Sequence, residues 1–160
     1  MHPIRRYKPS DLSAVIDIYR RSVHEVACCD YSPEQLAAWA PAKMDMHAWS
    51  KRLAEGGVFV ADQAGTLTGF IRVDAQGHID LLFVHPDFQR QGIALRLFQA
   101  ADGWACDAGV TQLTADVSLT ARPFFERVGF QVVTPQVVER NGVELTNFQM
   151  VRSPAPQGTD

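Results

Sequence analysis

The sequence contains few cysteines, three in 160 residues, and two of them are adjacent at Cys28 and Cys29. Three cysteines cannot all pair with one another, so a disulfide framework is not expected. No uninterrupted apolar run approaches the ~20 residues that a membrane-spanning helix needs. Residues 1–6 lack the apolar stretch of a secretory signal. We therefore expect a reducing, cytoplasmic setting and no membrane partner.

The sequence also lacks a strong excess of either charge. Its formal net charge is −3, so nothing in the total favours nucleic acid or an anionic membrane, and we expect neither as a partner. The 46% hydrophobic and 21% charged fractions are typical of a globular protein. The length suits one domain with a real core, which we assign to residues 1–152. Residues 153–160 contain two prolines and a glycine and are expected to form a flexible tail.

Residues 80–95 have the pattern of a buried strand, a short loop and the start of a long helix. Pro86 ends the strand, because proline cannot donate to a sheet ladder. Apolar residues recur with helical spacing from Ile93 onward, and Gly92 allows backbone to approach a ligand closely. The first N–H groups of a helix have no intrahelical partner and attract anions. We predict that the backbone from Arg90 to Leu95 cradles a diphosphate.

The remaining pattern predicts several strands and helices around this stretch. Strands are expected at residues 4–7, 58–61, 67–74, 78–84, 113–117, 131–138 and 143–152. Helices are expected after residues 9–11 and at 33–40, 46–54, 93–108 and 121–128. The expected helix caps are Ser10 or Asp11, then Ser32, Asp45 and Thr120.

Two turn and pairing features follow from the same pattern. Asn141-Gly142 predicts a tight hairpin turn, and Gly69 is a candidate β-bulge. Because a helix separates the strands at 78–84 and 113–117, these two strands are expected to be parallel.

The motif Gln-x-x-Gly-x-Ala at 89–94, preceded by Val-x-Pro at 84–86, resembles the signature of the GCN5-related N-acetyltransferase (GNAT) superfamily. Residues 121–130 are similar to a second piece of that family, and residues 30–41 resemble its YafP-like branch. The resemblance covers about residues 4–152. It implies an α/β fold (α+β by some schemes). That GNAT fold has a mixed, mostly antiparallel, twisted sheet of about six to seven strands, with helices on both faces.

The resemblance implies an N-acetyltransferase that uses acetyl-coenzyme A as co-substrate and needs no metal. The acceptor would be a primary amine of a small molecule or a peptide, attacking directly in a ternary complex. Main-chain groups of the strand before Pro86 would bind the pantetheine arm as an added strand, and the Val84 N–H would stabilise the oxyanion. The implied cofactor-binding residues are Leu82, Phe83, Val84, Gln89, Arg90, Gln91, Gly92, Ile93, Ala94, Leu95, Ser118 and Phe125.

Two of these cofactor positions differ from the family pattern. Ser118 stands where many members carry an asparagine, and it is either an arm contact or a strand-end cap. Phe125 stands where many members carry a tyrosine that protonates the leaving thiolate, and phenylalanine cannot donate a proton. Tyr31 is the first candidate to replace it, ahead of Tyr19 and Tyr7, because it is expected on a loop. Water is the alternative donor, since a thiol pKa of ~8.5 lies only about 2 kcal/mol from neutral pH.

Asp80 and His78 are the candidates for the general base. Alternate residues of a strand share a face, so positions 78, 80, 82 and 84 are expected on one side. Apolar neighbours on that side would raise the pKa of Asp80 and improve it as a base. His78 aligns with an acidic base of some family members, and imidazole titrates near neutral pH. The alternative is an exposed strand-start histidine and a hydrogen-bonded structural aspartate.

The acceptor pocket is expected between the first two helices, with His24, Tyr31 and Trp39 as its binding residues. A metal held by His24 and the adjacent cysteines is disfavoured, because neighbouring cysteines are awkward joint ligands. The alternative to an enzyme is an acyl-coenzyme A-binding sensor or partner protein with little or no turnover, which Phe125 favours. The last hairpin offers an edge through which two copies could pair as a homodimer.

Overall fold

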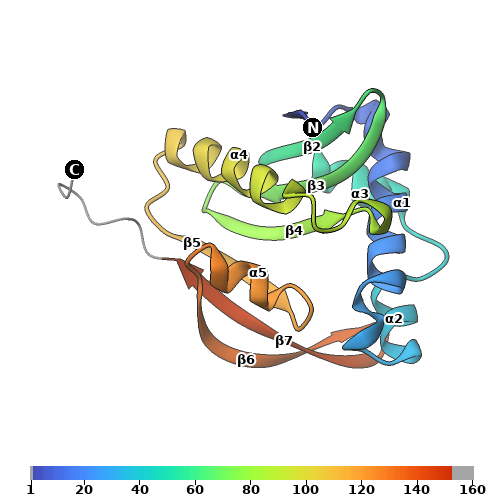
Figure 1. The fold of residues 1–160 in the computed structure, drawn as a ribbon. Coiled ribbons are helices and arrows are strands. Elements are labelled where there is room, and N and C mark those ends of the chain that lie inside the picture. Colours follow the sequence, from blue (N-terminus) through green and yellow to red (C-terminus); the bar gives the residue numbers. More distant parts are fainter. Residues whose placement is uncertain (1, 153–160) are drawn as a thin grey trace.

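The computed structural model describes residues 2–152, which form a seven-stranded sheet in the order β1-β2-β3-β4-β5-β7-β6 (Figure 1). The strands are β1 (Ile4–Arg6), β2 (Gly57–Gln63), β3 (Thr66–Val73), β4 (His78–Val84), β5 (Leu113–Ser118), β6 (Gln131–Arg140) and β7 (Val143–Arg152). The β4–β5 pair is parallel and the other pairs are antiparallel. The predicted mixed sheet and its parallel pair are confirmed. The predicted tail at residues 153–160 lies outside the described residues.

Five α-helices of the described chain cover the two faces of the sheet, as predicted. They are α1 (Leu12–Glu25), α2 (Pro33–Trp39), α3 (Met46–Leu53), α4 (Ile93–Asp107) and α5 (Arg122–Arg127). Short 3-10 turns lie at η1 (Pro9–Asp11), η2 (Ala27–Cys29) and η3 (Pro86–Phe88). Within residues 2–152, none of the helices has the length and apolar character needed to cross a membrane.

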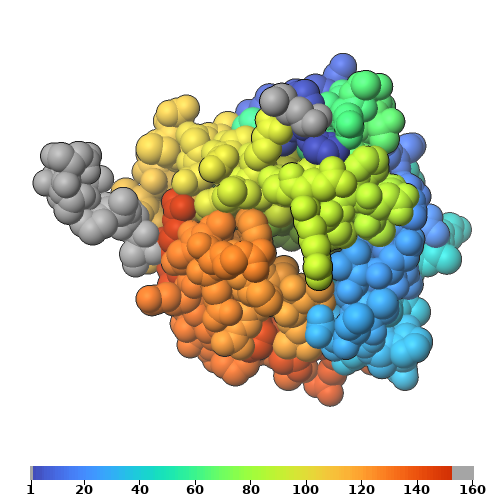
Figure 2. Space-filling view, viewed as in Figure 1, coloured from blue at the N-terminus to red at the C-terminus, as the bar shows by residue number. Residues whose placement is uncertain are grey.

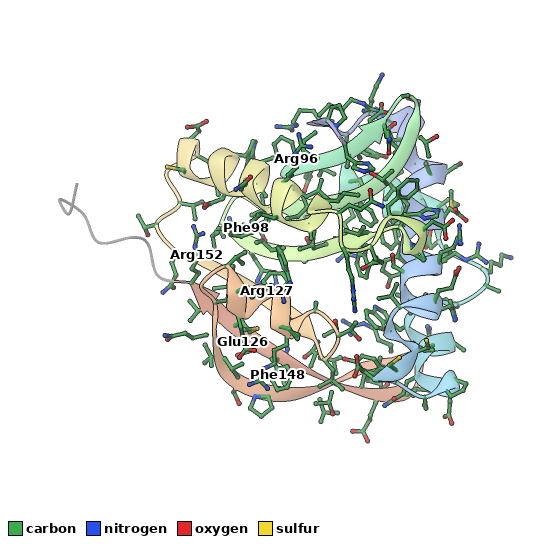
Figure 3. The ribbon with its side chains drawn as sticks, in the orientation of Figure 1. Arg96, Phe98, Glu126, Arg127, Phe148 and Arg152 are labelled. Atoms are coloured by element: carbon green, nitrogen blue, oxygen red, sulfur yellow. The ribbon has the colours of Figure 1, made fainter. Side chains whose placement is uncertain are left out.

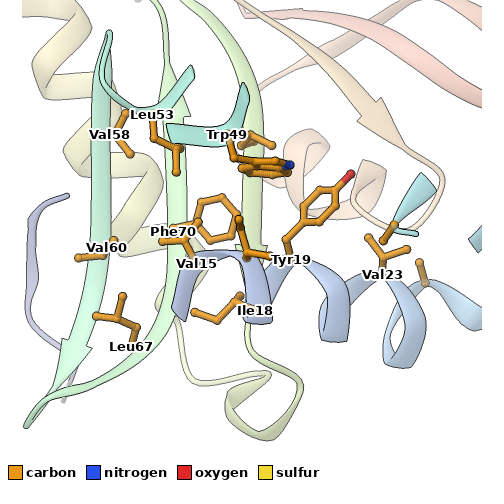
Figure 4. Close-up of a cluster of buried hydrophobic side chains, with 14 of the residues drawn as sticks. Val15, Ile18, Tyr19, Val23, Trp49, Leu53, Val58, Val60, Leu67 and Phe70 are labelled. Atoms are coloured by element: carbon orange, nitrogen blue, oxygen red, sulfur yellow. The ribbon is translucent and has the colours of Figure 1, made fainter. Parts of the chain in front are cut away.

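Two hydrophobic cores lie on opposite sides of the sheet. On one side, α1 and α3 pack on β2, β3 and β4 around Val15, Ile18 and Phe70, all of which are fully buried (Figure 4). On the same side, α2 packs on β7. On the other side, α4 and α5 pack on the sheet through residues such as Leu97 and Phe125. Each helix therefore buries one apolar stripe, as its 3.6-residue period requires.

Helix α4 is tied to the far half of the sheet by the last residue of β7. Arg152 Nη2 donates to Asp102 Oδ1 of α4 at 2.6 Å, and its guanidinium lies 5.1 Å from the centre of the Phe98 ring (Figure 3). An ion pair and side-chain packing thus join the sheet to α4, on the same face of the sheet as the predicted diphosphate site.

Most predicted helix boundaries are confirmed, and so are two of the four predicted caps. Ser32 Oγ accepts from the Gln35 N–H at 3.1 Å, Asp45 Oδ1 accepts from the Ala48 N–H at 3.0 Å, and Asn141-Gly142 forms the hairpin turn with φ values of 50° and 80°. Thr120 does not cap α5, because its hydroxyl donates to Asp30 Oδ2 at 2.7 Å.

Neither proposed cap of α1 caps it, because the Asp11 carboxylate has other partners. Two Arg5 nitrogens each donate to that carboxylate at 2.9 Å, and the Lys8 N–H donates to it at 2.9 Å. Asp11 therefore joins β1 to the start of α1.

Two β-bulges shape the strands near the site. Thr68 is the extra residue on β3, next to Gly69, where a bulge was expected. On β4, Leu81 pairs with Arg72 and Ile79 pairs with Val73, so Asp80 is left without a partner on β3. A bulge shifts the alternation of side chains by one residue. Accordingly, Ile79 packs in the core beneath α4, whereas Leu81 packs in the core beneath α1.

The bulge is accompanied by an early end to the pairing of β4 with β5. The two strands pair at His78 with Thr114 and at Ile79 with Ala115, and beyond these residues they separate. After Ile79, the edge of β4 that faces β5 has no partner strand, although β3 still pairs with the opposite edge as far as Val84. This leaves a gap in the middle of the sheet.

The Arg5–Asp11 pair should make stability depend on acid pH. The side-chain hydrogen bonds from Arg5 hold the pKa of Asp11 below its usual range. A depressed pKa contributes stability above the ordinary carboxyl pKa, and this stability is lost as the pH falls through the folded value. We expect Asp11→Asn to lower the free energy of unfolding at pH 7 by about 1–2 kcal/mol, and to flatten its loss below pH ~4.

Urea unfolding across pH 3–7 measures both effects. Asp17→Asn, at an exposed position of α1, is the control and should change little. Parallel pH profiles for the wild type and Asp11→Asn would contradict the assignment.

Candidate active site

The loop before α4 presents unused backbone N–H groups to solvent. Gly92, the N-cap residue, has φ 76° and no side-chain cap, and Arg90 has φ 61°. The first intrahelical bond runs from the Arg96 N–H to Gly92 O at 3.2 Å. The amides of Ile93, Ala94 and Leu95 thus belong to the first turn, whose N–H groups have no intrahelical acceptor. This is the geometry of an anion site.

Two glutamine side chains of the loop hold it in place. Gln89 Nε2 donates to Val84 O at 2.8 Å, which closes the loop onto the end of β4. Gln91 Oε1 lies 2.8 Å from His2 Nε2, and the other ring nitrogen of His2 lies 3.2 Å from Thr68 Oγ1. The His2 side chain is buried, so the start of the chain anchors the loop to the bulge of β3.

A cavity of about 660 Å³ opens beside these amides. Figure 2 shows it as a hollow between the yellow-green residues that lead into α4, the orange α5 and the blue α1. Its volume is that of a typical ligand site, about 300–1,000 Å³. Arg90 and Arg127 line it, and Figure 3 shows Arg127 on the side of α5 that faces α4. Neither arginine pairs with a carboxylate in the described part of the chain, so the cleft is cationic.

The open edge of β4 forms one wall of this cavity. The His85 N–H donates to Thr68 O at 2.8 Å, so the backbone groups of His85 face β3. In an antiparallel pair alternate residues face the partner, so Leu82 and Val84 direct their N–H groups to the other side, into the gap. Val84 O is held there by Ser22 Oγ at 2.6 Å. An extended ligand could therefore pair with β4 as an added strand.

A second, smaller cavity of about 180 Å³ lies on the α1 side of the sheet. Both cavities are lined by Trp39, Leu82, Phe83, Ser118 and Ala121. The two spaces thus meet where β4 and β5 separate. A ligand in the larger cavity and a second ligand in the smaller one would have their ends in contact at this point.

Asp80 lines the smaller cavity, but its surroundings are not those expected. Its Oδ2 accepts from Arg52 Nη2 at 2.8 Å and from Arg72 Nη1 at 2.9 Å, whereas Oδ1 is buried and has no partner among residues 2–152. The prediction of an apolar environment was therefore wrong. The bulge is the reason, because it turns Asp80 toward α3, away from the face of Leu82 and Val84.

His78 lines neither cavity. Its Nδ1 lies 2.8 Å from Thr114 Oγ1 and its Nε2 lies 3.2 Å from Asp116 Oδ2. Asp116 itself lines the smaller cavity, so His78 reaches that cavity through Asp116.

Tyr31 is buried and joins the end of β5 to β7. Its hydroxyl donates to Thr146 O at 2.7 Å and accepts from the Leu119 N–H at 2.9 Å. Burial raises the pKa of Tyr31. Its ring lines the smaller cavity beside Trp39, with ring centres 5.3 Å apart.

The other predicted positions are divided between the site and the rest of the protein. Phe125 is buried and lines the smaller cavity. Ser118 Oγ accepts from the Ala121 N–H at 3.1 Å, as expected of a strand-end cap, and the residue also lines both cavities. His24 is exposed, lies 2.7 Å from Ala40 O and lines neither cavity. Among the described residues, no three His, Cys, Asp or Glu side chains are grouped as metal ligands.

Several residues of the site were missed from the sequence. Ser22 is a polar residue in the apolar stripe of α1, and Arg72 is a charge within a buried strand, so both carried a local signal. Arg52, Arg140 and Asn147 come from distant surface-type positions, and no local pattern marks them. They line the smaller cavity only because α3 meets β4 at Asp80 and the last hairpin lies beside β5 and α2.

Comparison with known proteins identifies relatives over nearly the whole chain. The acetyltransferase (GNAT) domain family matches residues 28–152. The Escherichia coli K12 protein described as uncharacterized N-acetyltransferase YafP is 40% identical over 151 residues, which cover 94% of this chain and 95% of that protein.

Solved structures give the same result. A GCN5-related N-acetyltransferase from Rhodopseudomonas palustris is 32% identical, with a TM-score of 0.92 over 96% of each chain. The PaiA N-acetyltransferase from Thermoplasma acidophilum, solved in complex with coenzyme A, is 19% identical, with a TM-score of 0.77 over 96% of this chain and 99% of that one.

The bridging hydroxyl of Tyr31 should contribute measurably to stability. Tyr31→Phe removes one donor and one acceptor and leaves the Leu119 N–H and Thr146 O without their partner. We expect the free energy of unfolding to fall by about 1–2 kcal/mol. Urea titration measures it, with Tyr7→Phe as the matched control, since the Tyr7 hydroxyl bonds to none of the described residues. An unchanged midpoint for Tyr31→Phe would show that the bridge is not maintained in solution.

Proposed function

The chain belongs to the GNAT family of acetyltransferases, and on that basis we propose its reaction: transfer of an acetyl group from acetyl-coenzyme A to a primary amine. The acceptor is a small molecule or a peptide, and both substrates are bound together. The observation that carries this proposal is the junction of two cavities at the open edge of β4. One cavity suits a long phosphorylated co-substrate and the other suits a small acceptor.

The larger cavity supplies what coenzyme A requires. The free amides at the start of α4 and the side chains of Arg90 and Arg127 suit its phosphates. The Leu82 and Val84 edge suits the amide-rich pantetheine arm. A thioester at the end of that arm would then lie near Phe83 and Ser118, which line both cavities. The PaiA relative, which binds coenzyme A, supports this choice of co-substrate.

Transfer follows from attack of the amine nitrogen on the thioester carbonyl. The N–C bond forms, the C–S bond breaks, the nitrogen loses a proton and the sulfur gains one. The Val84 N–H faces the gap and suits the developing oxyanion. A free alkyl amine has a pKa of ~10.4, so removing its proton near pH 7 costs about 4–5 kcal/mol. Asp80 is the proposed base, with its unpartnered Oδ1 beside the smaller cavity. His78, acting through Asp116, is the alternative.

Neither Phe125 nor Tyr31 is a ready acid for the leaving thiolate. Phe125 lines the smaller cavity and cannot donate a proton. The Tyr31 proton is already donated to Thr146 O, so Tyr31 would have to release that carbonyl in order to act. Water suffices energetically, because a thiol pKa of ~8.5 lies only about 2 kcal/mol from pH 7.

A sensor that binds acyl-coenzyme A without turnover is the second candidate, and Phe125 is the residue that favours it. The second cavity favours the enzyme, because a sensor has no need of an acceptor site. Thiol release measured over a panel of amines separates the two. A sensor releases none above the rate of hydrolysis.

Gly92→Ala should weaken coenzyme A binding. The position has φ 76° and open space around it, so an added methyl group would project next to the amides proposed to hold the diphosphate. We expect the Kd for coenzyme A, measured by calorimetry, to rise by about tenfold or more. Gly65→Ala is a matched control, since Gly65 has φ 93°, also has open space, and lies in the β2–β3 turn. Equal Kd values for Gly92→Ala and the wild type would refute the diphosphate site.

Asp80→Asn should lower kcat in a pH-dependent way. General-base catalysis contributes about 10²–10⁴-fold, so we expect a loss of that order near pH 7. The loss should shrink as the pH approaches the pKa of the acceptor, because the amine then loses its proton without help. The Kd for coenzyme A should not change, since Asp80 does not line the larger cavity.

Asp116→Asn and His78→Gln, tested in the same way, decide between the two bases. A pH-dependent loss in these variants, and not in Asp80→Asn, would assign the role to His78. A loss in Asp80→Asn that is the same at every pH would mean that Asp80 only holds Arg52 and Arg72.

A further inference from the structure

The smaller cavity contains a positive charge that no carboxylate of the described chain neutralises. Arg140, the last residue of β6, lines the cavity, and its Nη1 donates only to Glu139 O at 3.2 Å. Arg52, the other guanidinium of the lining, is paired with Asp80 at 2.8 Å. An arginine that faces a concave site without a partner is well suited to bind a carboxylate or another planar anion.

The carboxylates around Arg140 are either held by other groups or lie on the other face of the sheet. Asp80 and Asp116 line the same cavity, but Asp80 pairs with Arg52 and Arg72, and Asp116 accepts from Gln136 Nε2 at 3.1 Å and lies 3.2 Å from His78 Nε2. Cross-strand partners share a face, and Val138 pairs with Leu145 in the core beneath α1 and α2. Arg140, two residues after Val138, is on that same face. Glu139 and its partner Glu144 are therefore on the opposite face.

The positive charge lies close to the aromatic wall of the cavity. Burial raises the pKa of Tyr19 to about 12, and the charges of Arg52 and Arg140 both act on its hydroxyl and oppose that rise. The Tyr19 hydroxyl also donates to Trp39 O at 3.1 Å. Arg140 is exposed to solvent, and it also lines the cavity close to Tyr19.

The opposite end of the cavity is rich in hydrogen-bond acceptors. Asn147 Oδ1 and Asp80 Oδ1 are both buried, and within residues 2–152 neither has a partner. Asn147 pairs with Ser118, the residue that lines both cavities, so it lies near the junction where the thioester would be. An amine donates hydrogen bonds, and unsatisfied buried acceptors are costly, so this end suits the amine of the acceptor.

The two ends are separated by a short distance along β7. Val143, the partner of Arg140, and Asn147 are four residues apart, a span of roughly 13 Å between Cα atoms. Arg140 and Asn147 both line the same cavity, and the long Arg140 side chain shortens the distance between their polar groups. The cavity volume of about 180 Å³ lies below the roughly 300–1,000 Å³ of a typical ligand site. The acceptor therefore has room for few atoms between its two polar groups.

We propose that the acceptor is a small amine that also carries an acidic group, with an amino acid as the simplest case. Arg140 binds the acid, and the amine lies beside Asn147 and Asp80 at the junction with the co-substrate. This inference rests on the proposed acetyltransferase function and narrows its substrate class. Arg140 is then a specificity-determining residue.

Pairs of compounds that differ only in their acidic group provide a test of this proposal. Each of a set of small amino acids is compared with its decarboxylated amine, and kcat/KM is measured by thiol release from acetyl-coenzyme A. We expect the wild type to prefer the amino acid of the best pair by about tenfold or more. Arg140→Met should abolish that preference by raising KM for the amino acid, with little effect on the matched amine. Arg140→Lys should keep part of it.

Arg20→Met, on α1 and in neither cavity lining, is the control for loss of a surface charge. A wild type that acetylates both members of every pair equally overturns the acid-binding inference and leaves the acetyltransferase intact. An equal loss on both members in Arg140→Met also overturns it. If no amine is acetylated, the proposed function fails. In that case, calorimetry measures how tightly each member of a pair binds to the complex of the protein with coenzyme A. Equal affinity for both members overturns the acid-binding inference.

Discussion

The site depends on one break in the sheet, the separation of β4 from β5 after Ile79. A parallel ladder that continued would use the N–H groups of Leu82 and Val84 and would close the passage between the two faces. Because the ladder stops after two pairs of residues, a β-strand edge is available in the middle of the molecule. Exposed edges normally attract any extended chain. Here the edge lies inside a cleft, so only a ligand that enters the cleft can pair with it.

The break is held open by contacts from elements that are distant in sequence. The bulge at Asp80 turns β4, and the pairs of Asp80 with Arg52 and Arg72 keep that turn attached to α3. At the other end of β4, Ser22 and Gln89 hold Val84 O from two sides. The open edge is therefore fixed at both ends before any ligand arrives, which lowers the ordering cost of binding. In our proposal this preorganised edge aims a thioester at the smaller cavity.

The two cavities differ in chemistry in a way that matches two substrates. The larger one has free backbone amides at the start of α4 and two lining arginines that pair with no carboxylate of residues 2–152, which suits phosphate groups. The smaller one has aromatic walls, buried oxygen acceptors at the junction and Arg140 at the far end. Acceptors next to the junction and a cation away from it impose a direction on a bound amine. In our proposal the same chain provides both binding and orientation, and the oxyanion contact requires only a backbone N–H.

Local chemistry in the sequence was sufficient for the elements and for the conformation of the loop before α4. Proline at position 86, the positive φ available to Gly92, the Ser32 and Asp45 caps and the Asn141-Gly142 turn act over a few residues, and the structure has the elements they predict. The face of Asp80 was not predictable in this way, because a bulge depends on the register between β3 and β4. The ion pairs of Asp80 and the cavity role of Arg140 depend on α3 and on the last hairpin, which are distant in sequence and meet only in the folded chain. Short-range backbone rules were thus readable from the order of residues, whereas side-chain direction and charge pairing were decided by tertiary packing.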